Sequence, residues 1–388
     1  MYDSIMNTYG RFPIVLEKGE GCYVWDDKGN KYLDFTAGIA VNTLGHGNKK
    51  LSMAISEQAQ KLIHVSNFYW TKPLIDLADK LVSHSDFDQA FFCNSGTEAV
   101  EAAIKLARKY ASINHPGRFE IISMKNSFHG RTFAALTATG QEKYKKGLDP
   151  LVPGIIHADF NDFNSLLSLT SEKTCAILLE PIQGEGGIRP ADAEYLQKVR
   201  QFCDDHDIML IFDEVQCGVG RTGNFFAYEH YGICPDAVSM AKGLAGGVPI
   251  GAILAKAQFS SAFGPGDHAS TFGGNPLATA AANVIVDELF DGGLLEHVKK
   301  VSEYMLKNLQ ELKAEFPVIV DVRGVGLLVG AEFAEPVTTI IKKCMENGLL
   351  VINAGTNILR FVPPLVVNEA EIEEGFKILE AVLKEIFS

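Results

Sequence analysis

The sequence predicts an α/β protein whose core is a parallel β-sheet, and two patterns lead to this prediction. Apolar runs at 175–179, 208–212 and 237–240 are too short for helices, and each ends near charged or glycine-rich residues, as buried strands do. A segment with helical periodicity, 192–206, separates the first two runs. A strand, a helix and a second strand in this order form the unit from which parallel sheets are built.

The composition of the 388 residues excludes several classes of function. The net charge of -13 argues against a nucleic-acid partner, because neutralising phosphates requires a basic face. No window approaches the roughly 18 apolar residues of a membrane helix, and no basic leader is present, so we expect neither a membrane partner nor a targeting segment. The seven cysteines are dispersed without a C-x-x-C pair, which predicts free thiols and a cytoplasmic protein. The histidines lack zinc-site spacing, so we expect no metal.

The first 84 residues are expected to supply scaffold. Residues 1–50 carry two short apolar segments, 22–25 and 32–35, on either side of a polar turn, which predicts strands. Apolar residues then recur at intervals of three and four over 51–64 and 73–84, which predicts two amphipathic helices.

A predicted strand at 90–93 leads into a well-specified helix start. Ser95 and Glu98 form the S-x-x-E pattern of a capping box, and helical periodicity follows over 99–111. Free backbone N–H groups and the positive end of the helix dipole make such a start a binding site for anions. Capping boxes are also common as purely structural features, and both interpretations are open at this point.

Two of the predicted strands deliver charged residues to the same edge of the sheet. The run at 208–212 leads into Asp213, and the run at 237–240 leads into Lys242. Ligands bind outside the carboxyl ends of parallel strands, so the two side chains can converge on one molecule. Each alone would be an ordinary turn acid or surface lysine. Together they suit pyridoxal phosphate chemistry, in which a lysine forms a Schiff base with the cofactor aldehyde and a carboxylate keeps the ring nitrogen protonated.

The stretch 210–251 resembles the signature of the class III, or ornithine-type, aminotransferases of fold type I, which use pyridoxal 5'-phosphate. The resemblance implies that Lys242, in the S-x-A-K-G-L segment, carries the cofactor. It also implies that Asp213, in D-E-V-Q, pairs with the pyridine nitrogen. Val215 would pack on one face of the ring, and Gln216 would reach the ring hydroxyl.

The same resemblance assigns three further segments to the cofactor. Gly96 and Thr97 would donate to its phosphate, with Ser95 close by, and Phe128 would stack on the pyridine ring. Thr271 would reach the phosphate from the neighbouring subunit. The resemblance therefore implies an obligate homodimer with shared active sites.

Four more residues are implied to bind substrate. Arg131 would grip a substrate carboxylate, and Ser270 would lie near the substrate. Glu185, in E-P-I-Q-G-E, would act as a gate that pairs with Arg360 while an amino donor is bound and releases it for a dicarboxylate. The implied reaction converts N2-acetylornithine and 2-oxoglutarate to N-acetylglutamate 5-semialdehyde and glutamate, a step of arginine biosynthesis.

Other functions stay open. Ornithine δ-, succinylornithine and 4-aminobutyrate aminotransferases share these motifs. Gly38 stands where ornithine δ-aminotransferases carry a bulky tyrosine, which leaves room for an N-acyl group, although a plain loop glycine is an equal interpretation. Gly218, Gly220 and Gly223 spell a dinucleotide-binding fingerprint, but no helical periodicity follows, so we expect a loop. A catalytically silent binding protein is disfavoured because every cofactor-contacting position of the motifs is filled.

The resemblance also implies the domain organisation. A large, mostly parallel α/β/α domain is expected at 51–275, and a small α+β domain is expected from 1–50 and 276–388 together. Within the last segment, helices and strands are expected at 298–312, 318–322, 326–333, 358–362 and 372–386.

Overall fold

The computed structural model describes residues 4–387, and its centre is a seven-stranded sheet with strand order β4-β12-β11-β10-β7-β5-β6. The strands are β4 (Gln89–Cys93), β5 (Glu120–Met124), β6 (Ile155–Ala158), β7 (Thr174–Leu179), β10 (Met209–Asp213), β11 (Ala237–Met240) and β12 (Gly251–Ala255). The pairs from β11 through β6 are parallel, which confirms the predicted parallel core. Only β12, which the sequence analysis did not anticipate, runs antiparallel to both of its neighbours.

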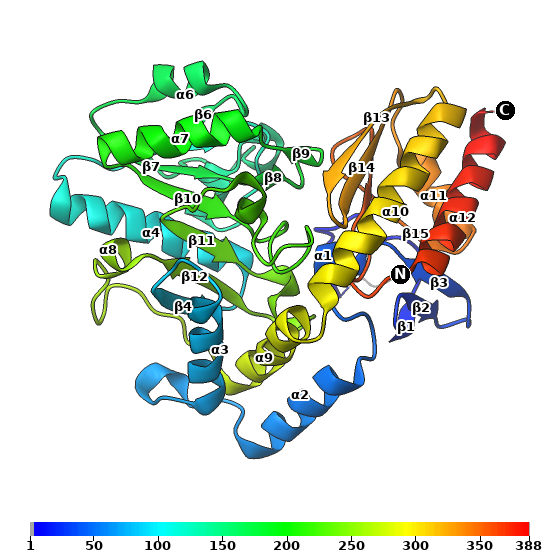
Figure 1. Cartoon of the computed structure of the whole chain (residues 1–388), viewed down its shortest axis with the longest axis horizontal. Coiled ribbons are helices and arrows are strands. Elements are labelled where there is room, and N and C mark those ends of the chain that lie inside the picture. The colour runs from blue at the N-terminus through cyan, green and yellow to red at the C-terminus, as the bar shows by residue number, and fades with distance from the viewer. Residues whose placement is uncertain (1–3, 388) are drawn as a thin grey trace.

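Helices cover both faces of this sheet (Figure 1). The helices of this lobe include α2 (Lys49–Lys61), α3 (Lys72–Ser83), α4 (Gly96–Asn114), α5 (Phe133–Ala138), α6 (Phe163–Leu169), α7 (Ala193–His206) and α8 (Ala257–Ser260), of which α2 packs on a further helix rather than on the sheet. Side chains alternate between the faces of a strand. Accordingly, Met209 and Ile211 of β10 pack in the cluster that contains α4, whereas Leu210 and Phe212 pack in the cluster that contains α7. Burial on both faces explains why β10 is continuously apolar.

Both ends of the chain contribute to a second lobe, on the right in Figure 1. One sheet has the order β1-β2-β3-β15 and the other β13-β14-β17-β16, so β15 of the C-terminal segment pairs with β3 of the N-terminal one. The strands are β1 (Leu16–Glu20), β2 (Tyr23–Asp26), β3 (Lys31–Asp34), β13 (Ile319–Val325), β14 (Leu328–Phe333), β15 (Leu349–Leu350), β16 (Ile352–Asn353) and β17 (Ile358–Phe361). The helices are α10 (Leu294–Glu315), α11 (Thr338–Glu346) and α12 (Glu369–Phe387).

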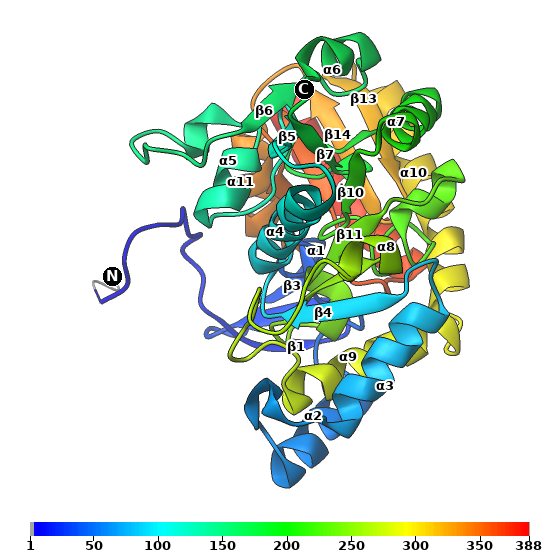
Figure 2. The ribbon, with the colours of Figure 1, turned by 90° about the vertical axis from the view of Figure 1, so that its left-hand side faces the viewer.

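The helix α9 (Pro276–Phe290) connects the two lobes. We expected residue 276 to begin the small domain, but α9 packs against α2 and α3 of the first lobe and continues toward α10. Figure 2 shows α9 beside α2 and α3. No helix within residues 4–387 is both long enough and apolar enough to span a bilayer.

The loops at the carboxyl edge of the large sheet face the second lobe. They include the short hairpin of β8 (Ile182–Gln183) and β9 (Arg189–Pro190), and the 3-10 turn η4 (Lys242–Ala245) that follows β11. Residues of β17 and of the short segment α1 (Ala37–Ala40) approach this edge from the other side. The fold therefore gathers most of the predicted site residues at the junction of the lobes.

Candidate active site

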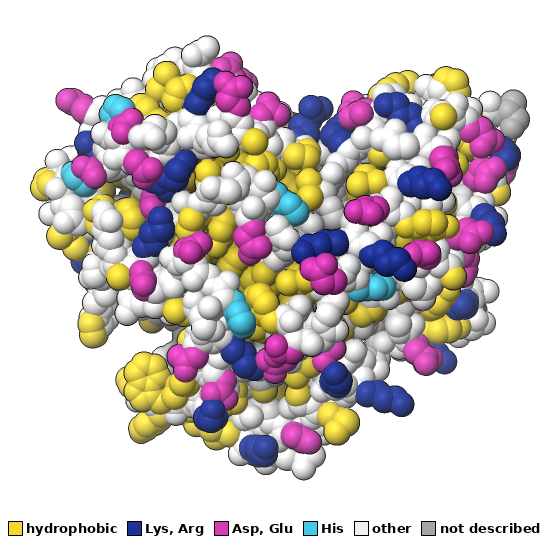
Figure 3. Space-filling view, viewed as in Figure 1, with side chains coloured by type: hydrophobic (Ala, Val, Ile, Leu, Met, Phe, Trp, Pro, Cys, Tyr) yellow, Lys and Arg dark blue, Asp and Glu magenta, His cyan; other side chains and the backbone are white. Residues whose placement is uncertain are grey.

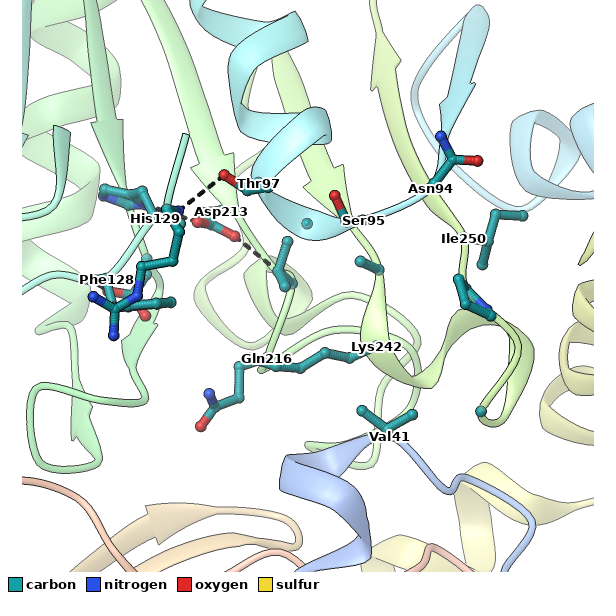
Figure 4. Close-up of a pocket in the computed structure, with 18 of the residues that line it drawn as sticks. Val41, Asn94, Ser95, Thr97, Phe128, His129, Asp213, Gln216, Lys242 and Ile250 are labelled. Atoms are coloured by element: carbon teal, nitrogen blue, oxygen red, sulfur yellow. Dashed lines mark hydrogen bonds and ion pairs between the residues drawn. The ribbon is translucent and has the colours of Figure 1, made fainter. Parts of the chain in front are cut away.

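A cavity of about 420 Å³ lies at this junction (Figure 4). Its volume falls within the range of roughly 300–1,000 Å³ that is usual for small-molecule sites. It is lined by Val41, Asn94, Ser95, Gly96, Thr97, Phe128, His129, Gly130, Arg131, Glu180, Asp213, Val215, Gln216, Ala241, Lys242, Gly247, Val248, Pro249 and Ile250. The structure thus brings together most of the residues that the sequence analysis assigned to one site.

Lys242 extends along the cavity toward Gln216 (Figure 4). Its backbone φ of +43° is a conformation that non-glycine residues adopt rarely, and such strain concentrates at functional sites. Its amine forms no hydrogen bond or ion pair with any residue among 4–387. Burial lowers the pKa of the ammonium, and the nearby Glu185 carboxylate opposes this shift. An unpaired lysine whose burial lowers the pKa of its ammonium is suited to act as a nucleophile or base.

Asp213, at the end of β10, is held by two donors. His129 Nδ1 lies 2.7 Å from its Oδ2, and the Val215 amide donates to its Oδ1 at 3.0 Å. The side chains of both His129 and Asp213 are almost completely buried. The sequence analysis missed His129, because a histidine 84 positions away carries no local signal of this contact. A buried carboxylate oriented in this way can stabilise a positive charge on a bound ligand.

Glu180 is a second buried carboxyl group beside this pair. It accepts hydrogen bonds from the Phe128 amide at 3.0 Å and from the Gly184 amide at 3.2 Å. Burial raises the pKa of Glu180 to about 7, with the nearby His129 opposing this rise and Asp213 adding to it. Glu180 therefore joins the loop after β5 to the loop after β7, and it was not among the predicted site residues.

The start of α4 forms one wall of the cavity. Ser95 Oγ accepts from the Glu98 amide at 3.3 Å, and the Glu98 carboxylate in turn accepts from the Asn94 amide at 2.9 Å. The cap therefore holds the helix start, while the first helical amides, at Gly96 and Thr97, have no intrahelical partner. The Thr97 hydroxyl accepts from the Arg131 amide at 3.1 Å and is already engaged.

Glycines let the cavity walls approach each other closely. A Cβ on Gly96 would lie 2.6 Å from a methyl carbon of Val215, and a Cβ on Gly130 would lie 2.2 Å from the Thr97 hydroxyl oxygen. Gly130 also has a φ of +137°, which disfavours any other residue. These contacts keep backbone amides, rather than side chains, at the surface of the cavity.

Phe128 and Arg131 lie together at the side of the cavity. The rings of Phe128 and Tyr144 meet edge to face with centroids 5.6 Å apart. The Arg131 guanidinium carbon lies 4.1 Å from the Tyr144 ring centroid and 5.4 Å from that of Phe128. Arg131 forms no ion pair with any described carboxylate, so its exposed guanidinium is oriented by aromatic contacts and is available to an anionic ligand.

The structure brings Glu185 and Arg360 into contact across the two lobes. One guanidinium nitrogen of Arg360 donates to Glu185 Oε1 and also to Gln216 Oε1, at 2.9 Å in the latter case. Burial, which alone would raise the pKa of Glu185, is outweighed by Arg360, so the pKa lies below its ordinary value. The Gln216 amide also donates to Glu185 at 3.2 Å, so both of its ends are occupied by this pair. The expectation was that Gln216 would reach a ring hydroxyl, and here it serves the ion pair.

Ser270 and Thr271 do not line this cavity. Both line a second, surface cavity of about 640 Å³ beside the exposed segment of Asn67, Phe68 and Trp70. Asn94 donates to the Ser270 hydroxyl at 2.9 Å, which fixes the loop, whereas Thr271 is exposed. Their predicted roles near the ligand therefore require a second copy of the chain.

Two alternative features find no support in the geometry. The glycines of the dinucleotide-like string lie in a loop, where Gly220 packs against Leu289 and Gly223 against Lys299. The absence of side chains at these glycines lets neighbouring residues pack closely against them, and it does not indicate a nucleotide site. Within residues 4–387, no group of three or more His, Cys, Asp or Glu side chains is arranged to hold a metal ion.

The residues present do fit pyridoxal 5'-phosphate. This cofactor requires an amine for its aldehyde, an anion site for its phosphate and a carboxylate for its ring nitrogen. Lys242, the free amides at the start of α4 and the His129-supported Asp213 supply these groups around one cavity. The crowded glycines at the wall let backbone donors reach a ligand directly.

Comparison with known proteins agrees with this chemistry. An acetylornithine aminotransferase from Caldanaerobacter subterraneus subsp. tengcongensis is 53% identical over 384 residues, which are 98% of each chain. The solved N-acetylornithine aminotransferase from Stenotrophomonas maltophilia is 37% identical, with a TM-score of 0.85 and coverage of 99% of both chains.

A second group of solved structures extends the likeness. An ornithine aminotransferase from Toxoplasma gondii, whose structure has partial occupancy of PLP at its active site, is 31% identical with a TM-score of 0.93, covering 99% of this chain and 93% of that one. The model of the family described as "Aminotransferase class-III" matches residues 4–383. Sequence and fold thus agree over nearly the whole length, and the chain belongs to the class-III aminotransferase family.

Proposed function

We propose that this aminotransferase uses pyridoxal 5'-phosphate to transfer the δ-amino group of N2-acetylornithine to 2-oxoglutarate. The products are N-acetylglutamate 5-semialdehyde and glutamate. The observation that carries the proposal is the placement of Lys242 and Asp213 in one cavity, with the Glu185–Arg360 pair bonded to Gln216 of the cavity lining. The choice of substrate is supported by the relatives at about 50% identity that bear the name acetylornithine aminotransferase.

Each group at the cavity has a distinct task in such a reaction. The bound cofactor would act as the electron sink for the carbanion chemistry. Lys242 would hold it and then move a proton at the substrate carbon that bears the amino group. Asp213, held by His129, would keep a positive charge on the ring nitrogen. Gly96 and Thr97 would donate backbone N–H groups to the phosphate.

The two arginines account for the two substrates. 2-Oxoglutarate carries two carboxylates, and the forked guanidinium groups of Arg131 and Arg360 can each bind one of them in a bidentate manner. N2-acetylornithine has one carboxylate and a neutral acetamide. Glu185 neutralises Arg360 while this donor is bound, and the dicarboxylate displaces Glu185 in the second half-reaction.

We further propose that the active unit is a homodimer with shared sites. Phe68 and Trp70, which line the second cavity, are 87% and 84% exposed, and their sequence neighbour Tyr69 and Phe272, which follows the lining residue Thr271, are 71% and 60% exposed. Figure 3 shows apolar side chains gathered at this end of the molecule. Exposed patches of this kind are typical of protein interfaces. A second copy seated there would carry its Thr271 toward the cofactor phosphate.

Subunit mixing tests this arrangement. Lys242→Ala and Thr271→Asp chains, each inactive alone, are co-expressed with different tags. If sites are shared, mixed dimers contain one intact site, and a statistical mixture recovers about a quarter of the parent activity. Recovery of no activity from verified mixed dimers would contradict shared sites.

The seven free cysteines, six of them buried, support a cytoplasmic location.

Separate half-reactions test the substrate. The cofactor-loaded protein is mixed, without any keto acid, with equal concentrations of N2-acetylornithine or of ornithine, and the cofactor absorbance is followed. Rapid bleaching by the acetylated compound alone is expected. A preference for free ornithine would instead indicate ornithine δ-transamination, the activity for which the Toxoplasma gondii relative is named.

Gly38 lies outside the cavity lining and has a φ of +64°. Its effect on the choice between acetylated and free ornithine is tested by Gly38→Ala in the same assay.

A further inference from the structure

Residues 37–40 form a left-handed turn at the mouth of the cavity. The φ angles of Ala37, Gly38, Ile39 and Ala40 are +46°, +64°, +66° and +63°. Only glycine adopts this conformation without steric cost, and runs of it are rare for L-residues. Such strain persists where the surrounding structure enforces it, and it concentrates at functional sites.

The carboxylate of Asp34 enforces this turn. Its Oδ1 accepts from the Thr36 amide at 2.9 Å, from the Thr36 hydroxyl at 2.6 Å and from the Ala37 amide at 3.0 Å. Its Oδ2 lies 2.9 Å from His46 Nε2, beyond the turn. Asp34 therefore clamps both ends of the segment 34–46, which we call the strap.

The strap ends in a contact with the turn that carries the candidate catalytic lysine. The buried hydroxyl of Thr43 donates to the carbonyl oxygen of Gly243 at 2.7 Å. A Cβ on Gly243 would lie 2.9 Å from this hydroxyl oxygen, so the approach depends on glycine. The Thr43 carbonyl accepts from the Leu365 amide at 3.0 Å, which ties the strap to the segment after β17.

The turn that receives this bond is itself strained and sparsely bonded. Lys242 has a φ of +43°, and the turn is closed by the Leu244 amide on Ala241 at 3.0 Å and by the Gly246 amide on Gly243 at 3.3 Å. The Gly243 carbonyl thus accepts two donors, and the stronger by distance comes from Thr43. Figure 4 shows the strap residue Val41 beside the Lys242 side chain at the cavity.

We propose that Thr43 is a positioning residue for Lys242. Its hydroxyl fixes the plane of the peptide group between Gly243 and Leu244, one residue beyond Lys242, and so restrains the turn from which the lysine side chain leaves the backbone. The bond from Leu365 ties Thr43 to the segment that follows β17, the strand that carries Arg360, and so couples the position of the lysine amine to that of the carboxylate-binding guanidinium. The inference rests on the proposed catalytic role of Lys242.

Three variants test the proposal. Thr43→Val preserves shape but removes the donor, and Thr43→Ser restores it. Thr170→Val is the matched control, because the Thr170 hydroxyl donates to the Leu166 carbonyl at 3.0 Å at the end of α6, away from the cavity. Two readouts use the cofactor-free chain: hydrogen exchange of the peptide 241–246, and the rate at which an amine-reactive reagent labels Lys242, located by mass spectrometry. The third readout is the separate measurement of kcat and KM in the cofactor-loaded enzyme.

With Thr43→Val we expect exchange in 241–246 to rise about tenfold, as expected for the loss of one hydrogen bond in a local opening. We also expect faster labelling of Lys242, because the turn that buries its amine opens more often, and a kcat about tenfold lower at a KM within about a factor of two, because the amine is misplaced rather than the substrate unbound. Thr43→Ser and Thr170→Val should behave as the parent.

Unchanged exchange and kcat in Thr43→Val would overturn the proposal, as would a rise in exchange spread over the whole chain. Equal effects of the valine and serine variants would overturn it too, because they would assign the effect to packing. The variant Lys242→Ala distinguishes a failure of the proposed function from a failure of the positioning role of Thr43. If that variant keeps the parent activity, the role of Lys242 is wrong, whereas a dead Lys242→Ala beside a normal Thr43→Val refutes only the positioning role.

Discussion

Replacing Glu185 by glutamine should impair the half-reaction with N2-acetylornithine more than the half-reaction with a dicarboxylate. The substitution keeps the shape of the side chain but removes the negative charge that faces Arg360, a residue only 2% exposed. Removing one partner of a fully buried ion pair costs roughly 3–5 kcal/mol. The Glu185 side chain is 22% exposed, and Gln216 continues to accept from Arg360, so we expect a smaller loss of about 1–3 kcal/mol in the free energy of unfolding.

The same charge change should alter substrate preference. An uncompensated Arg360 favours dicarboxylates over a donor with one carboxylate. A charge-assisted hydrogen bond contributes about 1.5–3 kcal/mol, so kcat/KM for N2-acetylornithine relative to glutamate should fall about tenfold or more. Single-turnover absorbance measurements with each amino donor provide the ratio. Glu194→Gln, which removes an exposed i,i+4 pair with Lys198, is the control and should change neither stability nor preference.

The stability effect has a defined dependence on pH. The fold lowers the pKa of Glu185 below its ordinary value of 4.5. The stabilisation that the Glu185 carboxylate gives the folded protein is therefore complete above pH 4.5, and it is lost as the pH falls through the lowered pKa of the folded state. The stability gap between the parent and Glu185→Gln, measured by urea unfolding without cofactor, should narrow below pH 4.5. Equal losses in both half-reactions, or a gap that does not narrow in acid, would refute the reasoning.

Three further predictions concern other parts of the site. Gly130→Ala, which places a Cβ 2.2 Å from the Thr97 hydroxyl oxygen at a φ of +137°, should weaken cofactor binding about tenfold or more in equilibrium dialysis, and unchanged affinity would contradict the crowding argument. Arg131→Lys should raise KM for 2-oxoglutarate about tenfold with little change in kcat, because lysine cannot bind a carboxylate in a bidentate manner, whereas a fall in kcat alone would exclude this role. Glu214, which follows Asp213, is fully buried and accepts from the amides of Ala227 and Tyr228 at 2.6 and 2.7 Å. Burial raises the pKa of Glu180 to about 7 and that of Glu214 to about 8, so the folded state binds protons that the unfolded state has released, and the unfolding free energy should fall as the pH rises from 4.5 through about 8. Glu214→Gln should flatten this slope in urea titrations, and an unchanged slope would contradict the assignment.

Local patterns predicted the elements that place the site. The apolar runs before Asp213 and Lys242 are β10 and β11, side by side and parallel, as expected from their length and position. The capping pattern at Ser95 marks the start of α4. In each case the signal lies within a few residues of the element, where hydrophobic burial and capping act directly on the chain.

Features that depend on distant partners could not be predicted in this way. The contact of Glu185 with Arg360 joins residues 175 positions apart and was expected only from the family resemblance. The pairing of His129 with Asp213 and the antiparallel course of β12 had no local signal. The left-handed turn at 37–40 is enforced by Asp34 through tertiary hydrogen bonds, and the sequence A-G-I-A does not specify it.

The most direct test of the central claim is chemical identification of the residue that holds the cofactor. The loaded protein is reduced with borohydride, digested and mapped by mass spectrometry, with Lys242→Ala treated in parallel. We predict a single pyridoxyl-modified lysine at position 242 in the parent and no modification in the variant. Modification of another lysine in the parent, or an equal degree of modification in Lys242→Ala, would contradict the assignment of this cavity as the catalytic centre.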